Sequence, residues 1–204
     1  MNGITEVFFD VETKKIFADI PDFDPGKLGV SIVSVYKRTV DENGKEVDGF
    51  MQSFWEEDFE KMWPVFSEAK RIIGFNSIKF DVLALKPYAP NYFAKLPHFD
   101  IYAEIKKVSD RAASLNNIAK ETLDKEKIDD GLNAVYYWEK HDVESLAKLK
   151  KYCEADVAIT RDVYDYIVQN KVVLFKDKWN TLRKVSLDFS YLEDKVDKTQ
   201  TSLF

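Results

Sequence analysis

Val7-Phe8-Phe9-Asp10-Val11-Glu12-Thr13 is a run of apolar residues that ends in two acidic side chains. Aromatic and β-branched residues favour a strand, and side chains two positions apart in a strand point to the same side. Asp10 and Glu12 therefore share one side of the predicted strand. Two carboxylates so close repel each other, which favours a bound divalent cation with oxygen ligands, such as Mg²⁺ or Mn²⁺. A solvated strand end is the alternative.

The same spacing occurs a second time, at Asp142-Val143-Glu144. With 36 acidic residues among 204, an Asp-x-Glu pair is expected by chance. The two copies differ in position, because the first ends an apolar strand and the second opens a polar helix. Position therefore favours the first copy as the candidate metal site.

The rest of the chain predicts a meander of strands followed by alternating strands and helices. Asn43-Gly44 is a strong signal for a hairpin turn between the second and third strands. The predicted strands cover 28–39, 47–54, 71–75 and 96–99, the helices 57–69, 78–86, 101–107, 114–122, 131–139 and 143–169, and a closing hairpin 172–176 with 181–185.

This order of elements predicts an α/β domain with a mixed central sheet, in which an antiparallel three-strand meander and parallel strands are flanked by helices. It is the order of an RNase H-like fold. We expect this domain to span residues 1–190. Residues 191–204 are expected to form a polar, flexible tail.

The composition excludes several classes of protein. A hydrophobic content of 45% and an aromatic content of 14% exclude a disordered chain. No apolar run is long enough to span a bilayer and residues 1–5 lack the features of a signal peptide, so we expect a cytoplasmic protein without a membrane partner. The net charge of −6 argues against a protein that coats nucleic acid, but it allows a nuclease whose carboxylates hold metal ions.

Two further acidic residues are candidates for a site. Asp81 ends Gly74-Phe75-Asn76-Ser77-Ile78-Lys79-Phe80-Asp81, where a predicted strand turns into a helix. By itself, Asp81 is explained by the helix dipole, and Asn76 by helix capping or a turn. Asp156 lies four residues after Tyr152 on the long predicted helix, beside its apolar face. By itself it is a boundary residue, although a carboxylate buried there needs a partner.

In combination, these residues resemble a known family. Asp10-x-Glu12, Asn76-x-x-x-Phe80-Asp81 and Tyr152-x-x-x-Asp156 follow the order of the DEDD exonuclease superfamily. The tyrosine is typical of its DEDDy branch, which includes the proofreading domains of family A and family B DNA polymerases and RNase D. More closely, the chain resembles stand-alone bacterial RNase H-like 3′-to-5′ exonuclease domains related to the polymerase B exonuclease. The resemblance covers residues 4–186.

The resemblance implies roles for five side chains. Asp10, Glu12, Asp81 and Asp156 would be the metal-binding acids, and Tyr152 would orient the attacking water. Two divalent cations, Mg²⁺ or Mn²⁺, about 4 Å apart would activate the water and stabilise the leaving 3′ oxygen. Asp10 would bridge the two ions, with Glu12 and Asp156 on the nucleophile side and Asp81 on the other side.

Substrate contacts are expected from residues beside the acids. Thr13, Lys14, Lys79 and Asn76 are candidates for contacts to phosphates or to the terminal nucleotide, although loop lysines are commonly just solvated. Several aromatic residues could stack on bases of a single strand, with a place in the core as the alternative. They are Phe17, Tyr88, Tyr92, Tyr136, Tyr137 and Trp138.

Neither histidine competes with Tyr152 for its role. We expect His98 and His141 to be solvated or to cap helices, and Asp100 to form a structural hydrogen bond behind the site. The single cysteine, Cys153, excludes an internal disulfide framework and is expected to be a small apolar helix residue.

The last five residues, Gln200-Thr201-Ser202-Leu203-Phe204, resemble the short peptide that bacterial replication proteins insert into the sliding clamp. Gln200 and the two apolar anchors, Leu203 and Phe204, would be the partner-binding residues. The alternative is a terminus whose apolar side chains pack back on the domain.

Together these features imply a metal-dependent 3′-to-5′ exonuclease that acts on single-stranded DNA or RNA ends, with DNA preferred. One rival is an RNase D-like enzyme that processes RNA 3′ ends with the same metals. The other rival is a non-catalytic adaptor that keeps the fold and docks on the clamp.

Overall fold

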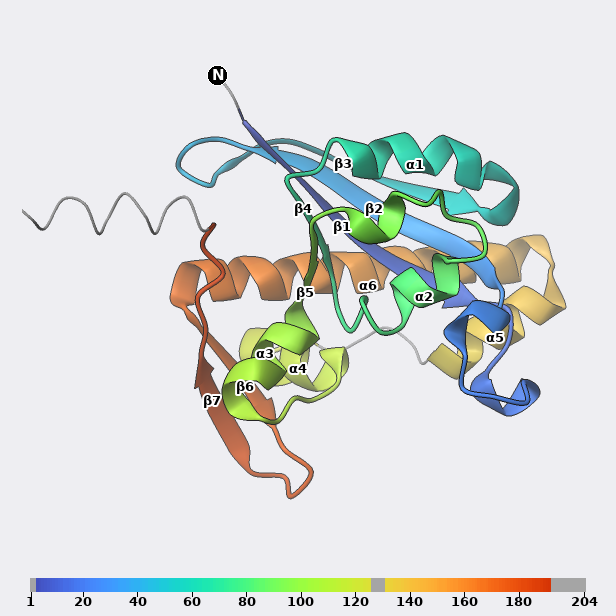
Figure 1. The fold of residues 1–204 in the computed structure, drawn as a ribbon. Coiled ribbons are helices and arrows are strands. Elements are labelled where there is room, and N and C mark those ends of the chain that lie inside the picture. The colour runs from blue at the N-terminus through green and yellow to red at the C-terminus, as the bar shows by residue number, and fades with distance from the viewer. Residues whose placement is uncertain (1–2, 126–130, 192–204) are drawn as a thin grey trace, which may run out of the picture.

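The computed structural model describes residues 3–125 and 131–191 of the chain. The strands of its main sheet are Ile4–Thr13 (β1), Val30–Val40 (β2), Glu46–Trp55 (β3), Arg71–Gly74 (β4) and His98–Asp100 (β5). They lie in the order β3-β2-β1-β4-β5 (Figure 1). The first three strands pair antiparallel, β4 runs parallel to β1, and β5 runs parallel to β4. The predicted mixed sheet with its three-strand meander is confirmed.

The turn between β2 and β3 has the chemistry of a stable hairpin. The carboxylate of Asp41 accepts the backbone N–H groups of Asn43 and Lys45, both at 2.9 Å. Gly44 has a φ of +75°, a conformation that glycine adopts without steric cost because it lacks a Cβ. The turn therefore fixes β3 as the antiparallel edge strand beside β2.

The helices are Phe59–Ser67 (α1), Asp81–Leu85 (α2), Ile101–Ser109 (α3), Leu115–Leu123 (α4), Gly131–Lys140 (α5) and Val143–Asn170 (α6). One face of the sheet packs against α3, α4 and α6, and the other face packs against α1 and α2 (Figure 1). The long helix α6 buries a stripe of apolar residues that runs from Leu149 to Ile167. Among the described residues, no helix combines the length and the apolar character needed to cross a bilayer.

Two helices are shorter than predicted. α2 begins at Asp81 instead of residue 78, because residues 77–80 form a turn after Asn76, whose φ of +60° lies outside the helical region. α1 covers Phe59–Ser67 instead of 57–69, because Glu56–Asp58 form a separate 3-10 turn before it. The spacing of apolar residues thus predicted where both helices lie. The residues at which the helices begin depend on the geometry of the preceding turns.

The predicted C-terminal hairpin is confirmed as β6 (Val172–Lys176) and β7 (Leu182–Ser186). It forms a second, two-stranded sheet that projects from the body of the molecule beside α3 and α4 (Figure 1). The Thr122 hydroxyl donates to the carbonyl of Leu174 at 2.7 Å, and the Asn117 amide donates to the carbonyl of Lys176 at 3.0 Å. These bonds fasten the hairpin to α4.

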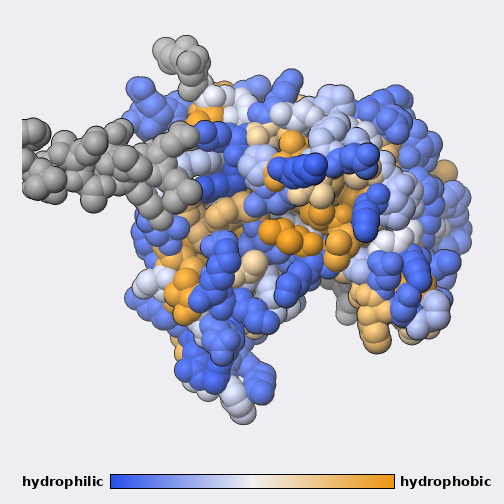
Figure 2. Space-filling model, viewed as in Figure 1, coloured by the Kyte–Doolittle hydropathy of each residue, from blue (hydrophilic) through white to orange (hydrophobic). Residues whose placement is uncertain are grey.

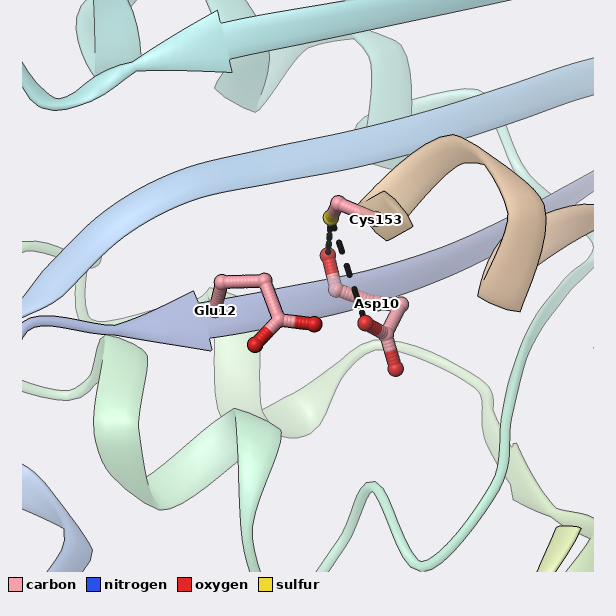
Figure 3. Close-up of side chains that lie close together, drawn as sticks. All are labelled: Asp10, Glu12 and Cys153. Carbon is pink, nitrogen blue, oxygen red and sulfur yellow. Dashed lines mark hydrogen bonds between the residues drawn. The ribbon is translucent and has the colours of Figure 1, made fainter. Parts of the chain in front are cut away.

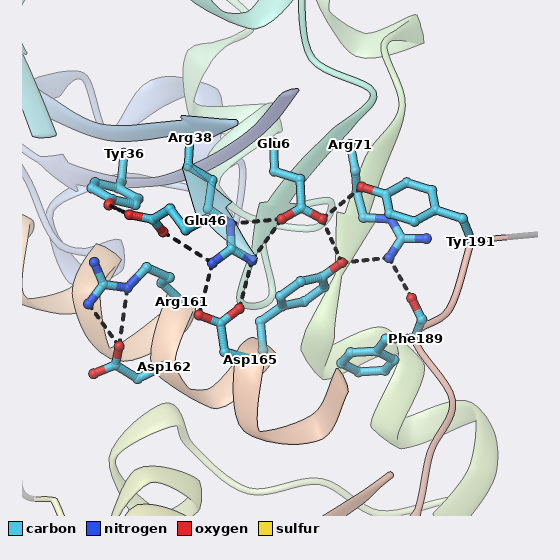
Figure 4. Close-up of polar contacts among 11 residues, drawn as sticks. Glu6, Tyr36, Arg38, Glu46, Arg71, Arg161, Asp162, Asp165, Phe189 and Tyr191 are labelled. Carbon is cyan, nitrogen blue, oxygen red and sulfur yellow. Dashed lines mark hydrogen bonds and ion pairs between the residues drawn. The ribbon is translucent and has the colours of Figure 1, made fainter. Parts of the chain in front are cut away.

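A buried network joins the N-terminal half of β1 to α6 (Figure 4). Glu6 is only 3% exposed, and Nε of its cross-strand neighbour Arg38 donates to it at 2.8 Å. The Arg38 guanidinium also donates to Asp165 on α6 at 2.6 Å. The hydroxyls of Tyr164 and Tyr191 donate to the Glu6 carboxylate at 3.0 and 2.7 Å. The network holds α6 and the segment that ends at Tyr191 against the sheet.

Candidate metal centre

The carboxylates of Asp10 and Glu12 lie on the same side of β1, near its C-terminal end (Figure 3). Cys153 on α6 lies against them. One carboxylate oxygen from each acid and the sulfur of Cys153 are all within 4.8 Å of one another. Both acids are only partly exposed. Two negative charges are therefore held close together where solvent screens them incompletely.

Asp81 brings a third carboxylate to this end of β1. It is the first residue of α2 and is 4% exposed. Its Oδ1 accepts the backbone N–H of Val11, the residue between the two acids of β1, at 3.2 Å. Burial, with smaller contributions from the charges of Asp100 and Asp156, raises the pKa of Asp81 to about 7. Loss of solvent is thus the main reason why a negative charge on Asp81 is costly, and the neighbouring carboxylates add to that cost.

Asp156 and Tyr152 reach the same place from α6. They are one helical turn apart and both are 5% exposed. Burial raises the pKa of the Tyr152 hydroxyl, and the charges of Asp156, Glu12 and Asp10 raise it further. Cys153, the residue after Tyr152 on α6, contacts Asp10, which places this part of the helix beside β1. The structure thereby brings together the four acids and the tyrosine from β1, α2 and α6.

The turn before Asp81 depends on Asp100, the last residue of β5. Its carboxylate accepts three backbone N–H groups, from Asn76 at 2.8 Å, Ile78 at 3.1 Å and Ala103 at 3.2 Å. The expected structural hydrogen bond of Asp100 is confirmed. Gly74 is needed in this turn, because a Cβ there would lie 2.5 Å from Cβ of Ser77. The turn is therefore tightly packed against the strand end.

Two of the residues predicted to contact substrate form interactions with other residues of the protein. The Thr13 hydroxyl donates to the carbonyl of Lys15 at 2.8 Å. The Lys14 ammonium pairs with Glu56 and lies 5.1 Å from the ring centroid of Trp138. Lys79, by contrast, is exposed and makes no ion pair with any residue that the structure describes. Asn76 is half-buried beside it.

An apolar hollow of about 260 Å³ lies beside Glu12. The rings of Phe17 and Phe80 meet there edge to face, with 6.1 Å between their centroids. Ile16 and Val135 add to its apolar lining, together with Val11 and Leu28. Of these residues, the sequence had marked only Phe17 as a candidate for base stacking. Phe80 could have been found from the sequence, because it is the aromatic residue of the Asn76-x-x-x-Phe80-Asp81 pattern. Ile16 and Val135 are recognised only from the fold.

The other aromatic candidates have mixed positions. Tyr92 is 45% exposed and Tyr136 is 57% exposed. The Tyr88 hydroxyl accepts the backbone N–H of Val30 at 3.2 Å, which gives it a structural role. Tyr137 and Trp138 are half-buried, and Trp138 also contacts Lys14.

The expectation that His98 is solvated or a helix cap is wrong. His98 is part of β5, and its ring packs against Phe9 and Phe93 with centroid distances of 6.2 and 5.0 Å. Its Nε2 lies 2.9 Å from the carbonyl oxygen of Phe93, and burial lowers its pKa. The histidine fills the small gap between two aromatic rings and the short strand. His141 is exposed, as expected.

The donor set fits a hard divalent cation. Four carboxylates offer oxygen ligands, which Mg²⁺ and Mn²⁺ prefer. Cys153 is a poor competitor, because burial raises its pKa well above the ordinary value and its thiol donates to the carbonyl of Asp10 at 3.5 Å. A protonated thiol is not a metal ligand. Burial is the main cause of the raised pKa of Asp81, and a bound cation would favour the ionised form of this carboxyl.

The predicted clamp-binding residues Gln200, Leu203 and Phe204 lie outside the described residues.

Comparison with known proteins identifies the family of this chain. The family model of the RNase H superfamily matches residues 7–168. The fold is similar to that of the family B DNA polymerase from the hyperthermophilic archaeon Pyrobaculum calidifontis, with a TM-score of 0.59 and 17% identity over 81% of this chain and 24% of the polymerase.

A zinc-bound complex of E. coli ExoI with single-stranded DNA gives a TM-score of 0.36 and 13% identity over 82% of this chain and 43% of that chain. The chain therefore spans less than half the length of either protein. No curated protein matches it. The family match covers most of the described domain, and the mixed sheet agrees with it. The chain belongs to the RNase H superfamily.

Proposed function

We propose that this protein is a metal-dependent 3′-to-5′ exonuclease of the DEDDy type, which removes nucleotides from single-stranded ends. The main support is that several acids meet near the end of β1: Asp81 accepts the N–H of Val11 between Asp10 and Glu12, and α6, which carries Tyr152 and Asp156, contacts Asp10 through Cys153. Membership of the RNase H superfamily is consistent with this chemistry. Such a cluster of carboxylates destabilises the fold unless a cation is bound, which favours a functional origin.

The four carboxylates would hold two divalent cations, Mg²⁺ or Mn²⁺. When bound, the cations would supply activation of the attacking water and stabilisation of the leaving 3′ oxygen. Tyr152 would orient that water. Because burial and the neighbouring acids raise the pKa of its hydroxyl, Tyr152 keeps its proton at neutral pH. It can therefore form a hydrogen bond with the water but cannot act as the base.

The apolar hollow beside Glu12 would receive the terminal base. Phe17 and Phe80 offer ring surfaces, and every base can stack on an aromatic ring without base-specific hydrogen bonds. A base must be unpaired to enter such a hollow, which favours single-stranded ends. DNA is the preferred substrate in this proposal because the tail residues Gln200, Leu203 and Phe204 resemble a clamp-binding peptide, and the bacterial sliding clamp would be the partner.

The test is digestion of matched end-labelled single-stranded DNA and RNA with Mg²⁺, Mn²⁺ or a chelator. Asp156→Asn removes a central carboxylate at constant size. Glu144→Gln, on the exposed start of the same helix, is the matched control. We expect a metal-dependent ladder from the 3′ end for the wild type and the control, and none for Asp156→Asn.

The ratio of the cleavage rates on DNA and on RNA would show which nucleic acid is the preferred substrate. Cleavage that survives both the chelator and Asp156→Asn would overturn the proposed site. The absence of any cleavage by folded, metal-loaded protein would favour an adaptor.

A further inference from the structure

A second hollow, of about 290 Å³, opens beside the turn that carries Asp81. It lies between that turn and α3, and it is lined by Asn76, Lys79, Tyr102, Lys106 and Lys107. Asp100 forms part of its wall, and the Asp100 carboxylate accepts the backbone N–H groups of Asn76 and Ile78 in the turn that leads to Asp81. The hollow therefore adjoins the acid cluster.

This hollow has a surplus of positive charge. Lys79 and Lys106 are exposed, and neither makes an ion pair within residues 3–125 and 131–191. Lys107 pairs with Glu104 at 2.5 Å. The buried carboxylate of Asp100 is occupied by three backbone N–H groups. In a chain with a net charge of −6, two uncompensated lysines at one hollow form a local anion-binding surface.

Tyr102 gives the hollow an aromatic wall. Its ring is half-buried and meets the ring of Phe75 edge to face at 5.7 Å, which holds it in place. Ammonium groups beside an aromatic ring are the combination that binds the phosphates and bases of single strands. Figure 2 shows hydrophobic residues gathered over α2 and the turn before it, where Ile78 is 45% exposed.

The same chemistry continues onto the β6–β7 hairpin. Arg111, just after α3, donates to Asp177 of the hairpin at 2.9 Å and lies 4.4 Å from the ring centroid of Trp179. Trp179 is 59% exposed in the turn of the hairpin, and Lys178 lies at the same distance from its ring. Residues 171–186 contain five Lys or Arg and one acidic residue. In Figure 2 this projecting part of the molecule is mostly hydrophilic.

We propose that the single-stranded substrate extends from the acid cluster across Lys79 and Lys106 to Trp179 on the hairpin. We call these residues, with Tyr102 and Arg111, the strand track. The inference rests on the proposed exonuclease function and deepens it. The track would contact phosphates through its cations and bases through its rings, so that it would bind any sequence. It would favour long strands over short ones, because only a long strand reaches the hairpin.

The first test measures binding of a long single-stranded oligonucleotide by fluorescence anisotropy in the presence of chelator, so that no cleavage is needed. We expect Lys79→Gln/Lys106→Gln to weaken binding about tenfold at low salt and to reduce the slope of log Kd against log salt by roughly 0.7 per lost phosphate contact. Lys45→Gln/Lys95→Gln removes the same charge from exposed lysines elsewhere and should change neither quantity.

The second test compares kcat/KM for the long oligonucleotide with kcat/KM for a dinucleotide. Trp179→Ala should reduce this ratio by about fivefold, because a dinucleotide cannot reach the hairpin. Trp179 is exposed, so the fold should tolerate the change, which thermal melting would verify. Single-stranded DNA and RNA are tested side by side.

Equal effects of the Lys79/Lys106 and Lys45/Lys95 pairs would overturn the track, even if the wild-type protein cleaves both substrates. A different outcome is that the wild type cleaves neither substrate but binds the oligonucleotide in the presence of chelator, and that Lys79→Gln/Lys106→Gln weakens this binding. That outcome would overturn the exonuclease and keep the track as a binding surface. The two failures are therefore distinguishable.

Discussion

Strand β1 carries carboxylates near both ends, and the protein treats them in opposite ways. Near the N-terminal end, Glu6 is 3% exposed and accepts hydrogen bonds from Arg38, Tyr164 and Tyr191. Near the C-terminal end, Asp10 and Glu12 meet more carboxylates. The first region surrounds one buried carboxylate with donor groups of the protein, and the second gathers several carboxylates at one place, where a bound cation would reduce their mutual repulsion. In the proposed function, the same strand serves stability at one end and chemistry at the other.

The largest expected effect is on activity at the C-terminal end. Asp10→Asn should lower kcat by about 10³-fold, because several kcal/mol of transition-state stabilisation would be lost with a metal ligand. Its thermal stability without metal should equal or exceed that of the wild type, because a repelling charge is removed. A nuclease assay and a melting curve on the same sample would measure both. A large loss of stability would contradict the contrast between the two ends.

The next effect is on stability at the N-terminal end. Glu6→Gln should lower the free energy of unfolding by about 3 kcal/mol, because the Arg38 charge loses its most buried partner. Urea unfolding would measure the loss. Glu46→Gln is the control: this carboxylate also faces Arg38, at 3.5 Å, but it is 36% exposed and should contribute about 1 kcal/mol or less. Similar losses for both variants would show that burial is not the cause.

Metal binding should distinguish the acids at the C-terminal end of β1 from Glu6 near its N-terminal end. Mn²⁺ at a hundred times its Kd should raise the Tm of the wild type by roughly 5–10 °C, because it binds only the folded state. Glu6→Gln should start from a lower Tm but keep the full rise. Asp10→Asn should lose the rise. Differential scanning fluorimetry with and without chelator would measure these shifts, and a rise retained by Asp10→Asn would move the metal elsewhere.

The smallest effect concerns His98, a half-buried side chain whose ring has a hydrogen bond at Nε2 only. Burial lowers the pKa of His98 from its ordinary value of 6.5. Among the described residues, its Nδ1 has no hydrogen-bond partner. The unfolded chain therefore takes up a proton that the folded chain resists. The contribution of His98 to stability is complete above pH 6.5 and is lost as the pH falls from 6.5 toward the lower pKa of the folded state.

Urea unfolding of the wild type and His98→Gln between pH 8 and pH 5 would reveal this difference in slope. His141→Gln, at an exposed position, should keep the wild-type slope. If His98→Gln also keeps the wild-type slope, another group causes the pH dependence.

Most of the fold could be predicted from the sequence because its signals are local. The alternation in β2, the Asn43-Gly44 turn and the apolar stripe of α6 each depend on neighbours within a few positions. The start of α2 was missed because it depends on the left-handed conformation of Asn76, which a carboxylate 24 residues away stabilises through the Asn76 N–H. Distant partners are not visible in a local pattern.

The acids of the candidate site could be predicted because a family pattern connects them. The residues around them could not. The hollow beside Glu12 joins Phe17 to Val135, and the hydrogen bond between Arg38 and Asp165 spans 127 positions. His98 was misjudged for a similar reason, because the rings that bury it come from other segments. Pairings of this kind follow from packing, which the sequence alone does not display.

The carboxylate of Asp100 adds direct hydrogen bonds between two neighbouring segments, the turn before α2 and the first turn of α3. One of its oxygens accepts N–H groups from both Asn76, before α2, and Ala103, in the first turn of α3. α2 begins with Asp81, and α3 carries Lys106 near its end. The distance between these helices cannot change without breaking bonds to a buried charge. Asp100 would therefore keep the distance between α3 and the acids constant. A single-stranded substrate bound to Lys106 on α3 would then enter the acid cluster at a fixed distance from that lysine.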